Sequence, residues 1–205
     1  MVSFSGKEDK HKHSVGFLVH KDIVNTVMGC RPVSSRRITI RLRAVPFNIT
    51  IVQAYAATPD YDGNEKEEFY DQLQNVISQT PKRNTFVVQG DWNAKMGKHA
   101  CGNWQGICGP FCNDDTSERG LRLLEFATFN DLVLANTFGH HKASRRWTWY
   151  SQKGQRHNQI DYILVRKCVR SGVNSARTQN FPGADIGSDH DMLMMIFPLH
   201  LKRIS

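Results

Sequence analysis

A run of apolar, β-branched residues that ends abruptly in polar side chains is the feature that most constrains this fold. Thr85-Phe-Val-Val-Gln89 has the composition of a strand that is buried on both faces. Gly90, Asp91 and Asn93 follow at once, so the strand ends by presenting a carboxylate and a carboxamide two residues apart. Burying such groups costs free energy unless they are paired or bind a ligand. The stretch therefore predicts a core sheet with chemistry at a strand end.

The hydrophobic pattern elsewhere predicts a mixed α/β fold. Residues 36–44 alternate, with Ile38, Ile40 and Leu42 on one face of a half-buried strand. Residues 64–79 have the spacing of a helix, and Pro81 follows its end. A second helix is expected from about residue 116 or 117 to about 130, and an irregular loop over 98–115. Further strands are expected at 15–20, 47–55, 84–90, 132–136, 145–151, 158–165 and 191–197, with the strands at 36–44 and 47–55 forming an antiparallel pair.

Composition places the chain among ordinary globular proteins. Of its 205 residues, 40% are hydrophobic and 22% charged, which favours one folded domain over a disordered chain. We expect that domain at 15–205, preceded by a polar, basic and irregular end at 1–14 that is not part of the folded domain. No apolar run approaches the roughly 20 residues that span a bilayer, and no signal core is visible. A nuclear or cytoplasmic protein is therefore expected, neither secreted nor bound to a membrane.

Charge and cysteine content limit the partners. The net charge of +8 favours a polyanionic partner, although a generally basic surface would have the same charge. The five cysteines are an odd number and unevenly spaced, so reduced thiols are expected rather than a disulfide framework. Their spacing does not fit the paired cysteines of structural zinc sites. No small-molecule cofactor is indicated.

Three polar clusters lie at or near strand ends. They are Asp91 with Asn93, Asp161 inside an apolar strand, and Asp189 with His190 just before another. Each alone is most often a turn or cap residue. Together they suggest phosphodiester hydrolysis, because carboxylate and amide oxygens suit Mg²⁺ and a histidine oriented by a buried aspartate acts on protons at neutral pH.

These motifs resemble a known superfamily. The stretches GDWNA, IDYIL and SDHD, in this order, are similar to the signature of the endonuclease/exonuclease/phosphatase superfamily. The stretch RRWTWYS, and the sequence of the whole chain from about residue 15, resemble the apurinic-type endonuclease domains of RTE/BovB non-LTR retrotransposons. The resemblance implies the DNase-like fold, which is a four-layer α/β sandwich of two mixed sheets flanked by helices.

The resemblance also implies roles for the polar residues. Asp91 would position or deprotonate the attacking water, and Asn93 would orient that water. His190 would stabilise charge on phosphorus while Asp161 holds it, and Asp189 would bind Mg²⁺ or Mn²⁺. DNA is the implied partner, and a further set of residues would contact its phosphates or bases. These are Tyr55, Thr148, Ser188, Arg145, Arg146, Trp147, Arg156 and Asn158.

Three of these residues also have a purely structural alternative. Trp147 alternates with Trp149 on a predicted strand, and core packing is the expected role of at least one of them. Arg156 and Asn158 lie in a predicted hairpin turn, which either reaches a DNA groove or is simply solvated.

One departure from the superfamily leaves the activity open. Its members begin with strands that carry an asparagine and a metal-binding glutamate, whereas only 14 residues precede the strand expected at 15–20. Without that glutamate, Mg²⁺ would rest mainly on Asp189 and water. The chain is thus expected to be either a Mg²⁺-dependent nicking DNA endonuclease or an inactive DNA-binding or protein-interaction remnant. A phosphoinositide or other phosphoester substrate is a third possibility.

Overall fold

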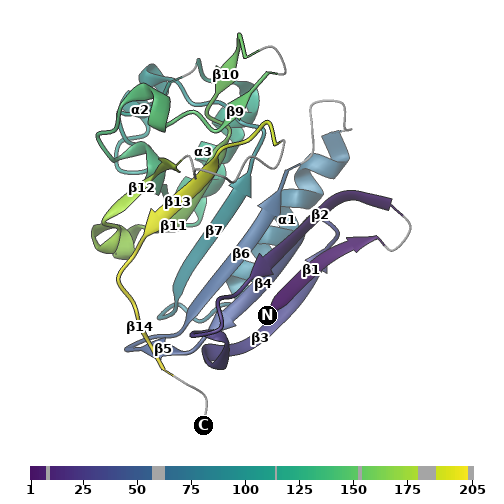
Figure 1. Ribbon diagram of the computed structural model, residues 1–205. Coiled ribbons are helices and arrows are strands. Elements are labelled where there is room, and N and C mark those ends of the chain that lie inside the picture. Colours follow the sequence, from purple (N-terminus) through teal and green to yellow (C-terminus); the bar gives the residue numbers. More distant parts are fainter. Residues whose placement is uncertain (8–9, 57–62, 114, 152–153, 180–187, 203–205) are drawn as a thin grey trace. The chain divides into compact units, whose positions relative to one another are not determined.

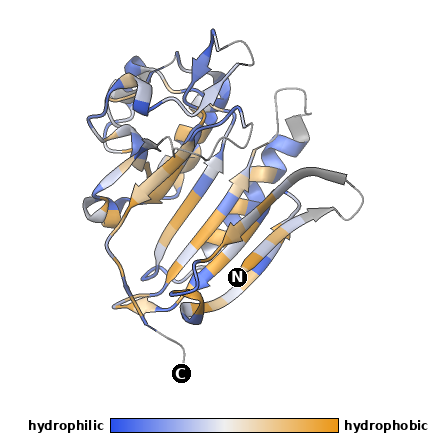
Figure 2. Cartoon of the chain, viewed as in Figure 1, coloured by the Kyte–Doolittle hydropathy of each residue, from blue (hydrophilic) through white to orange (hydrophobic). Residues whose placement is uncertain are grey.

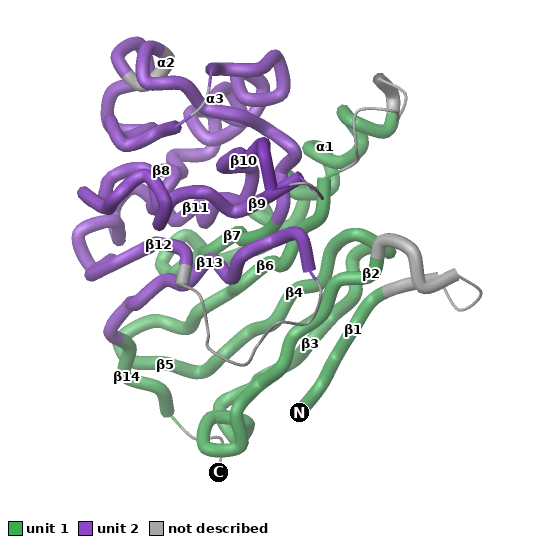
Figure 3. The backbone as a smooth tube through the Cα atoms, turned by 45° about the horizontal axis from the view of Figure 1, so that its top comes forward, with its two compact units in different colours: residues 1–90, 199–205 green, residues 91–198 purple. Residues whose placement is uncertain are grey.

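The structure is a computed structural model that describes residues 1–202 apart from 8–9, 57–62, 114, 152–153 and 180–187. The chain forms two compact units (Figure 3). Unit 1 holds residues 1–90 and 199–205, and unit 2 holds residues 91–198. Glu8 and the loop after Tyr55 lie outside the described residues. No described helix has the length and apolar character needed to cross a membrane.

Unit 1 is built on a mixed sheet. Its strands lie in the order β3, β4, β6, β7, and α1 connects β6 to β7, which run in the same direction (Figure 1). β4 and β6 are antiparallel, with Arg37 opposite Ala54 and Leu42 opposite Ile49. The predicted strand pair and helix are thus confirmed. The elements are β3 (Val27–Ser34), β4 (Arg37–Leu42), β6 (Ile49–Tyr55), α1 (Gly63–Gln79) and β7 (Thr85–Asp91).

The two faces of β4 follow the predicted alternation, with one exception. Ile38, Ile40 and Leu42 are buried, and Ile40 and Leu42 join a cluster with Val19. On the opposite face Arg37 is only 5% exposed, although we expected solvated side chains there. Its guanidinium donates a hydrogen bond of 2.7 Å to the carbonyl of Phe69 and stacks on the Phe69 ring, so helix α1 covers it.

The N-terminal residues differ from the irregular end that we expected. Val2–Lys7 forms β1, which pairs antiparallel with β2 (Lys10–Leu18). Ser5 on β1 is 4% exposed, whereas Val2 and Phe4 are 71% and 73% exposed. Ser5 therefore faces inward, whereas Val2 and Phe4 face outward. This inverts the usual pattern and explains why the strand is not visible in the sequence.

Gly90 determines how β7 ends. Its φ is +146°, and a Cβ at this position would lie 1.8 Å from the carbonyl oxygen of Ala54. Only glycine permits this conformation and this close approach. The chain therefore leaves the sheet at a fixed point, immediately before Asp91.

Unit 2 packs a helix against strands. Ser117 caps α3 by accepting a hydrogen bond from the Gly120 amide, as the predicted helix start implied. β8 and β11 are antiparallel, and Leu134 lies opposite Leu164 in a fully buried core. The strands that carry this core are mostly hydrophobic along their length (Figure 2). These elements are α3 (Glu118–Phe129), β8 (Leu132–Leu134) and β11 (Asp161–Arg166).

Shorter elements complete both units. In unit 2 they are α2 (Lys98–Asn103), which interrupts the expected loop, β9 (Trp149–Tyr150), β10 (His157–Asn158), β12 (Ser175–Gln179), β13 (Met192–Ile196) and the 3₁₀ helices η2 (Ala135–Thr137), η3 (Ala143–Arg145) and η4 (Lys167–Gly172). In unit 1 they are η1 (Val24–Thr26), β5 (Ala44–Val45) and β14 (His200–Leu201). The fold class is thus α/β, with mixed strands and few helices, as predicted.

Candidate functional site

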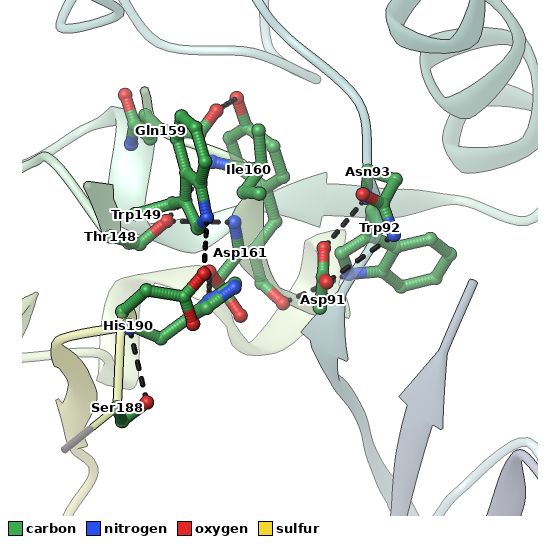
Figure 4. A network of polar contacts seen from close by, with 12 residues as sticks. Asp91, Trp92, Asn93, Thr148, Trp149, Gln159, Ile160, Asp161, Ser188 and His190 are labelled. Atoms are coloured by element: carbon green, nitrogen blue, oxygen red, sulfur yellow. Dashed lines mark hydrogen bonds and ion pairs between the residues drawn. The ribbon is translucent and has the colours of Figure 1, made fainter. Parts of the chain in front are cut away.

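Trp92 anchors the segment that carries the first predicted cluster. Its indole Nε1 donates a hydrogen bond of 3.0 Å to the carbonyl of Tyr162, and its backbone amide donates to Ile160, also at 3.0 Å. The side chain is 1% exposed. Because Trp92 points into the core of unit 2, its neighbours Asp91 and Asn93 are left half-buried on the other side (Figure 4).

Asp91 and Asn93 form a closed turn. The backbone amide of Asn93 donates to Asp91 Oδ1 at 2.8 Å, and the Asn93 side-chain amide donates to Oδ2 at 3.3 Å. Asn93 has a φ of +48°, which asparagine tolerates better than most residues. Burial, and then the charge of Asp161, raise the pKa of Asp91 to about 7, while the hydrogen bond from Asn93 opposes the rise. Asp91 therefore exchanges a proton near neutral pH.

Asp161 and His190 lie together, as the sequence predicted. Asp161 Oδ2 is 2.9 Å from His190 Nδ1. Burial by itself lowers the pKa of His190, but the hydrogen bond and charge of Asp161, with Asp91 and Asp189 further away, outweigh it, and the pKa is raised. The imidazole is thus oriented by a carboxylate and favours its charged form.

Thr148 supports Asp161. Its Oγ1 accepts hydrogen bonds from the backbone amides of Ile160 and Asp161, at 3.0 and 3.1 Å. The residue is 0% exposed. We expected Thr148 to contact a phosphate, but a hydroxyl enclosed by two backbone amides favours a role in positioning β11.

Asp189 is exposed, and Trp149 holds its carboxylate. The Trp149 indole Nε1 donates to Asp189 Oδ2 at 2.8 Å, and the Tyr150 amide donates to the Asp189 carbonyl at 2.9 Å. Ser188, also exposed, accepts a hydrogen bond of 3.1 Å from the His190 amide. The predicted cluster at 188–190 is therefore a defined turn fixed against β9.

The metal-binding capacity of the site is modest. The described residues contain no group of three histidine, cysteine, aspartate or glutamate side chains that could hold an ion. Mg²⁺, however, is often held by one or two carboxylates together with water and substrate phosphate. The exposed carboxylate of Asp189 fits that mode, with Asp91 near enough for the two charges to interact. The donor set fits a weakly held Mg²⁺ that a phosphate helps to bind.

The predicted DNA-binding residues of unit 2 surround β9 and β10. Arg145 and Arg156 are exposed, and Asn158 pairs with Trp149 across the hairpin. Trp147 is half-buried, and its ring centroid lies 3.5 Å from that of His157. Trp147 thus packs within the hairpin and still reaches the surface.

Tyr55, in unit 1, has contacts of its own. It is half-buried at the end of β6, and the guanidinium carbon of Arg36 lies 5.4 Å from the centre of its ring. Its predicted phosphate contact stays a prediction.

Two supporting residues were not identified from the sequence. Trp149 binds Asp189 from 40 positions away, and Asn136 donates to the Asp161 carbonyl at 3.1 Å from 25 positions away. Asn136 is 2% exposed and also accepts a hydrogen bond from the Ile163 amide. A buried asparagine after an apolar strand was the only available signal.

Comparison with known proteins shows the family of this chain. Residues 49–194 match the endonuclease-reverse transcriptase family. The chain is 39% identical over 203 residues to craniofacial development protein 2 of Bos taurus and to that of Tragulus javanicus. It spans about a third of the length of these relatives, 33% and 34%.

Solved structures with the same fold are nucleases and a phosphatase. The endonuclease domain of TRAS1, a telomere-specific non-LTR retrotransposon, is 16% identical and superimposes with a TM-score of 0.63. This match covers 96% of the present chain and 80% of the TRAS1 chain. The AP endonuclease LMAP of Leishmania major matches 98% and 71%, with a TM-score of 0.63 and 14% identity. The Neisseria 3′ phosphatase NExo, bound to a product DNA hairpin, matches 84% and 71%, with a TM-score of 0.62 and 14% identity. The chain thus belongs to the endonuclease-reverse transcriptase family, within the endonuclease/exonuclease/phosphatase superfamily.

Proposed function

We propose that this chain is a Mg²⁺-dependent endonuclease that nicks DNA, of the retrotransposon type. The observation that carries the proposal is the contact of 2.9 Å between Asp161 and His190, with Asp91 near enough to affect the His190 pKa. A charged imidazole beside a carboxylic acid that titrates near neutral pH can stabilise one negative charge and move one proton. The net charge of +8 and the DNA hairpin bound by one structural relative support a DNA substrate.

The residues suggest a simple hydrolytic step. The oxygen of a water molecule attacks phosphorus, one P–O ester bond breaks, and the leaving oxygen takes up a proton from solvent. Asp91, ionised above about pH 7, accepts the proton of the water, and Asn93 keeps Asp91 in place. Protonated His190 stabilises the negative charge that develops on a phosphoryl oxygen. Mg²⁺ held at Asp189 would neutralise further charge on the same phosphate.

One observation favours a second candidate function. Because the described residues lack a group of three metal ligands, the site is weaker than a preformed metal centre. A DNA-binding module without catalysis is therefore the alternative. It predicts binding of DNA without Mg²⁺-dependent cleavage.

Nicking of supercoiled plasmid separates the two. Purified chain is incubated with plasmid in Mg²⁺ or in EDTA, beside the variants His190→Ala and Asp91→Ala. The endonuclease proposal expects nicking in Mg²⁺ that is lost in EDTA and in both variants. Retained, salt-sensitive DNA binding without nicking would establish the alternative, and faster release of phosphate from an inositol phosphate than cleavage of DNA would refute both.

A further inference from the structure

Five basic side chains of unit 2 gather around η3. This basic cluster consists of His140, His141, Arg145, Arg146 and Arg177. The first four follow one another closely before, in and after η3, and β12, which carries Arg177, lies against η3. Burial lowers the pKa of His141, and the charges of the other four groups lower it further. The other four groups are therefore near His141.

Several polar atoms in and beside the cluster have no partner. Arg146 Nε, Arg177 Nε and His141 Nε2 are buried and, within the described part of the chain, accept or donate no hydrogen bond. Thr178 is 1% exposed, and its hydroxyl oxygen likewise has no hydrogen-bond partner among the described residues. A buried polar group without a partner costs about 1–3 kcal/mol, and more if it is charged. Concentrating them in one place is unfavourable unless a ligand brings acceptor atoms.

Aromatic and backbone groups contact the cluster. The His141 ring lies so close to Gly139 that a Cβ there would be 2.6 Å from Nε2. The guanidinium carbon of Arg146 is 5.9 Å from the centre of the Phe111 ring, which in turn packs edge-on against His140 at 5.1 Å. None of these contacts supplies a hydrogen bond to Arg146 Nε or His141 Nε2.

We propose that Arg177, His141 and Arg146 form a second phosphate-binding site, which takes a backbone phosphate of the DNA that the catalytic site cleaves. This inference rests on the proposed function. Arg146 is three residues from Trp149, which forms a β-bridge with His190. Three residues span at most about 10 Å of backbone. The basic cluster is therefore connected by a short segment to the strand that contacts His190, which fits a phosphate of the same DNA.

A phosphate fits the cluster better than a single carboxylate does. A phosphodiester presents two non-bridging oxygens that share one negative charge and accept hydrogen bonds from several directions, and guanidinium groups bind such oxygens bidentately. Two arginines and a histidine that approach from separate elements can each reach a different oxygen lone pair. The new members relative to the sequence prediction are Arg177 and His141.

The salt dependence of DNA binding tests the proposal. Binding of a fluorescent DNA duplex is measured by anisotropy from 50 to 300 mM salt, roughly the range over which phosphate contacts dominate affinity. Each variant carries His190→Ala, so that the DNA stays intact. Removing one phosphate contact is expected to reduce the slope of log K against log salt by about 0.9. Arg177→Gln and His141→Gln are compared with Arg83→Gln, an exposed arginine of unit 1, and with Arg177→Lys.

Each outcome decides the proposal. A reduced slope in Arg177→Gln, with Arg83→Gln unchanged and Arg177→Lys restoring most of the slope, supports it. A wild-type slope in both Arg177→Gln and His141→Gln variants that keep the wild-type Tm overturns it, even if the chain with His190 intact nicks plasmid. A reduced slope in Arg177→Gln, when the chain with His190 intact does not nick plasmid, keeps the phosphate site and overturns the endonuclease function. Calorimetry with inorganic phosphate distinguishes the source, because phosphate binding lost in Arg177→Gln without a change in DNA binding would assign the site to a free anion instead.

Discussion

Replacing Asp161 with asparagine tests the contact on which the proposed chemistry rests. The Asp161 and His190 side chains are 17% and 29% exposed, so their contact of 2.9 Å is largely shielded from water. A hydrogen bond to a charged group contributes about 1.5–3 kcal/mol. Asparagine keeps the shape of the side chain but removes its charge. If this energy is expressed in the transition state, the nicking rate falls by roughly 10- to 150-fold.

The assay is single-turnover nicking with enzyme in excess, because it reports the chemical step. Asp161→Ala is expected to be about as slow as His190→Ala, since a histidine without its partner loses its orientation. The double variant is expected to be no slower than the slower single variant, because the two residues act as one unit. Asp22→Asn is the matched control. Asp22 lies 3.3 Å from His20 in an exposed pair of the same kind, and its loss should leave the rate unchanged.

Two results would refute the reasoning. Full activity of Asp161→Asn would mean that His190 does not need the carboxylate. Losses that multiply in the double variant would mean that the two residues act independently. Thermal unfolding of each variant separates these outcomes from loss of the fold.

Four more predictions follow from the same contacts. Trp149→Phe removes the donor at 2.8 Å from Asp189 and should raise the Mg²⁺ concentration for half-maximal nicking several-fold; an unchanged Mg²⁺ titration would contradict this. Thr148→Val leaves two buried amides without an acceptor and should cost about 1–3 kcal/mol, seen as a lower Tm that Thr148→Ser restores; weaker DNA binding at an unchanged Tm would instead indicate a phosphate contact. Nicking should rise with pH through about 7 as Asp91 loses its proton and fall at higher pH as His190 loses its own, whereas a flat profile from pH 6 to 8 would exclude both roles. The Asp91 pKa is raised from 3.8 to about 7, so ionisation of Asp91 lowers the free energy of unfolding as the pH rises through this range, and the loss is complete above it. Asp91→Asn should therefore raise the Tm at pH 8 but not at pH 3.

The parts of the fold that could be predicted are those where the local pattern and the burial agree. The alternation of 36–44 predicted β4, and the apolar stripe of 64–79 predicted α1 almost to the residue. β1 was missed because Ser5 faces inward and the apolar residues of the strand face outward. β3 was missed because Gly29 and Pro32 weaken its strand pattern, and its two register shifts accommodate them.

The site could be predicted as a set of residues but not as a network. Asp91, Asp161 and His190 carry motifs that the sequence displays, and the structure brings Asp161 and His190 into contact. The contacts that hold them are long-range. Trp149 and Asn136 act on residues 40 and 25 positions away, and no local periodicity reports such pairs.

Strand β9 explains why two distant motifs meet. On one side Thr148 Oγ1 accepts from the amides of Ile160 and Asp161, which fixes the start of β11. On the other side the Thr148 carbonyl accepts from Asp191, and the Tyr150 amide donates to Asp189, each at 2.9 Å, so the segment that carries His190 is held by the same residues. Strand β9 and the threonine before it, three residues in all, therefore set the distance between the carboxylate and the imidazole. Because the basic cluster begins only a few residues earlier in the chain, a DNA backbone bound there would be aligned by the element that assembles the candidate active site.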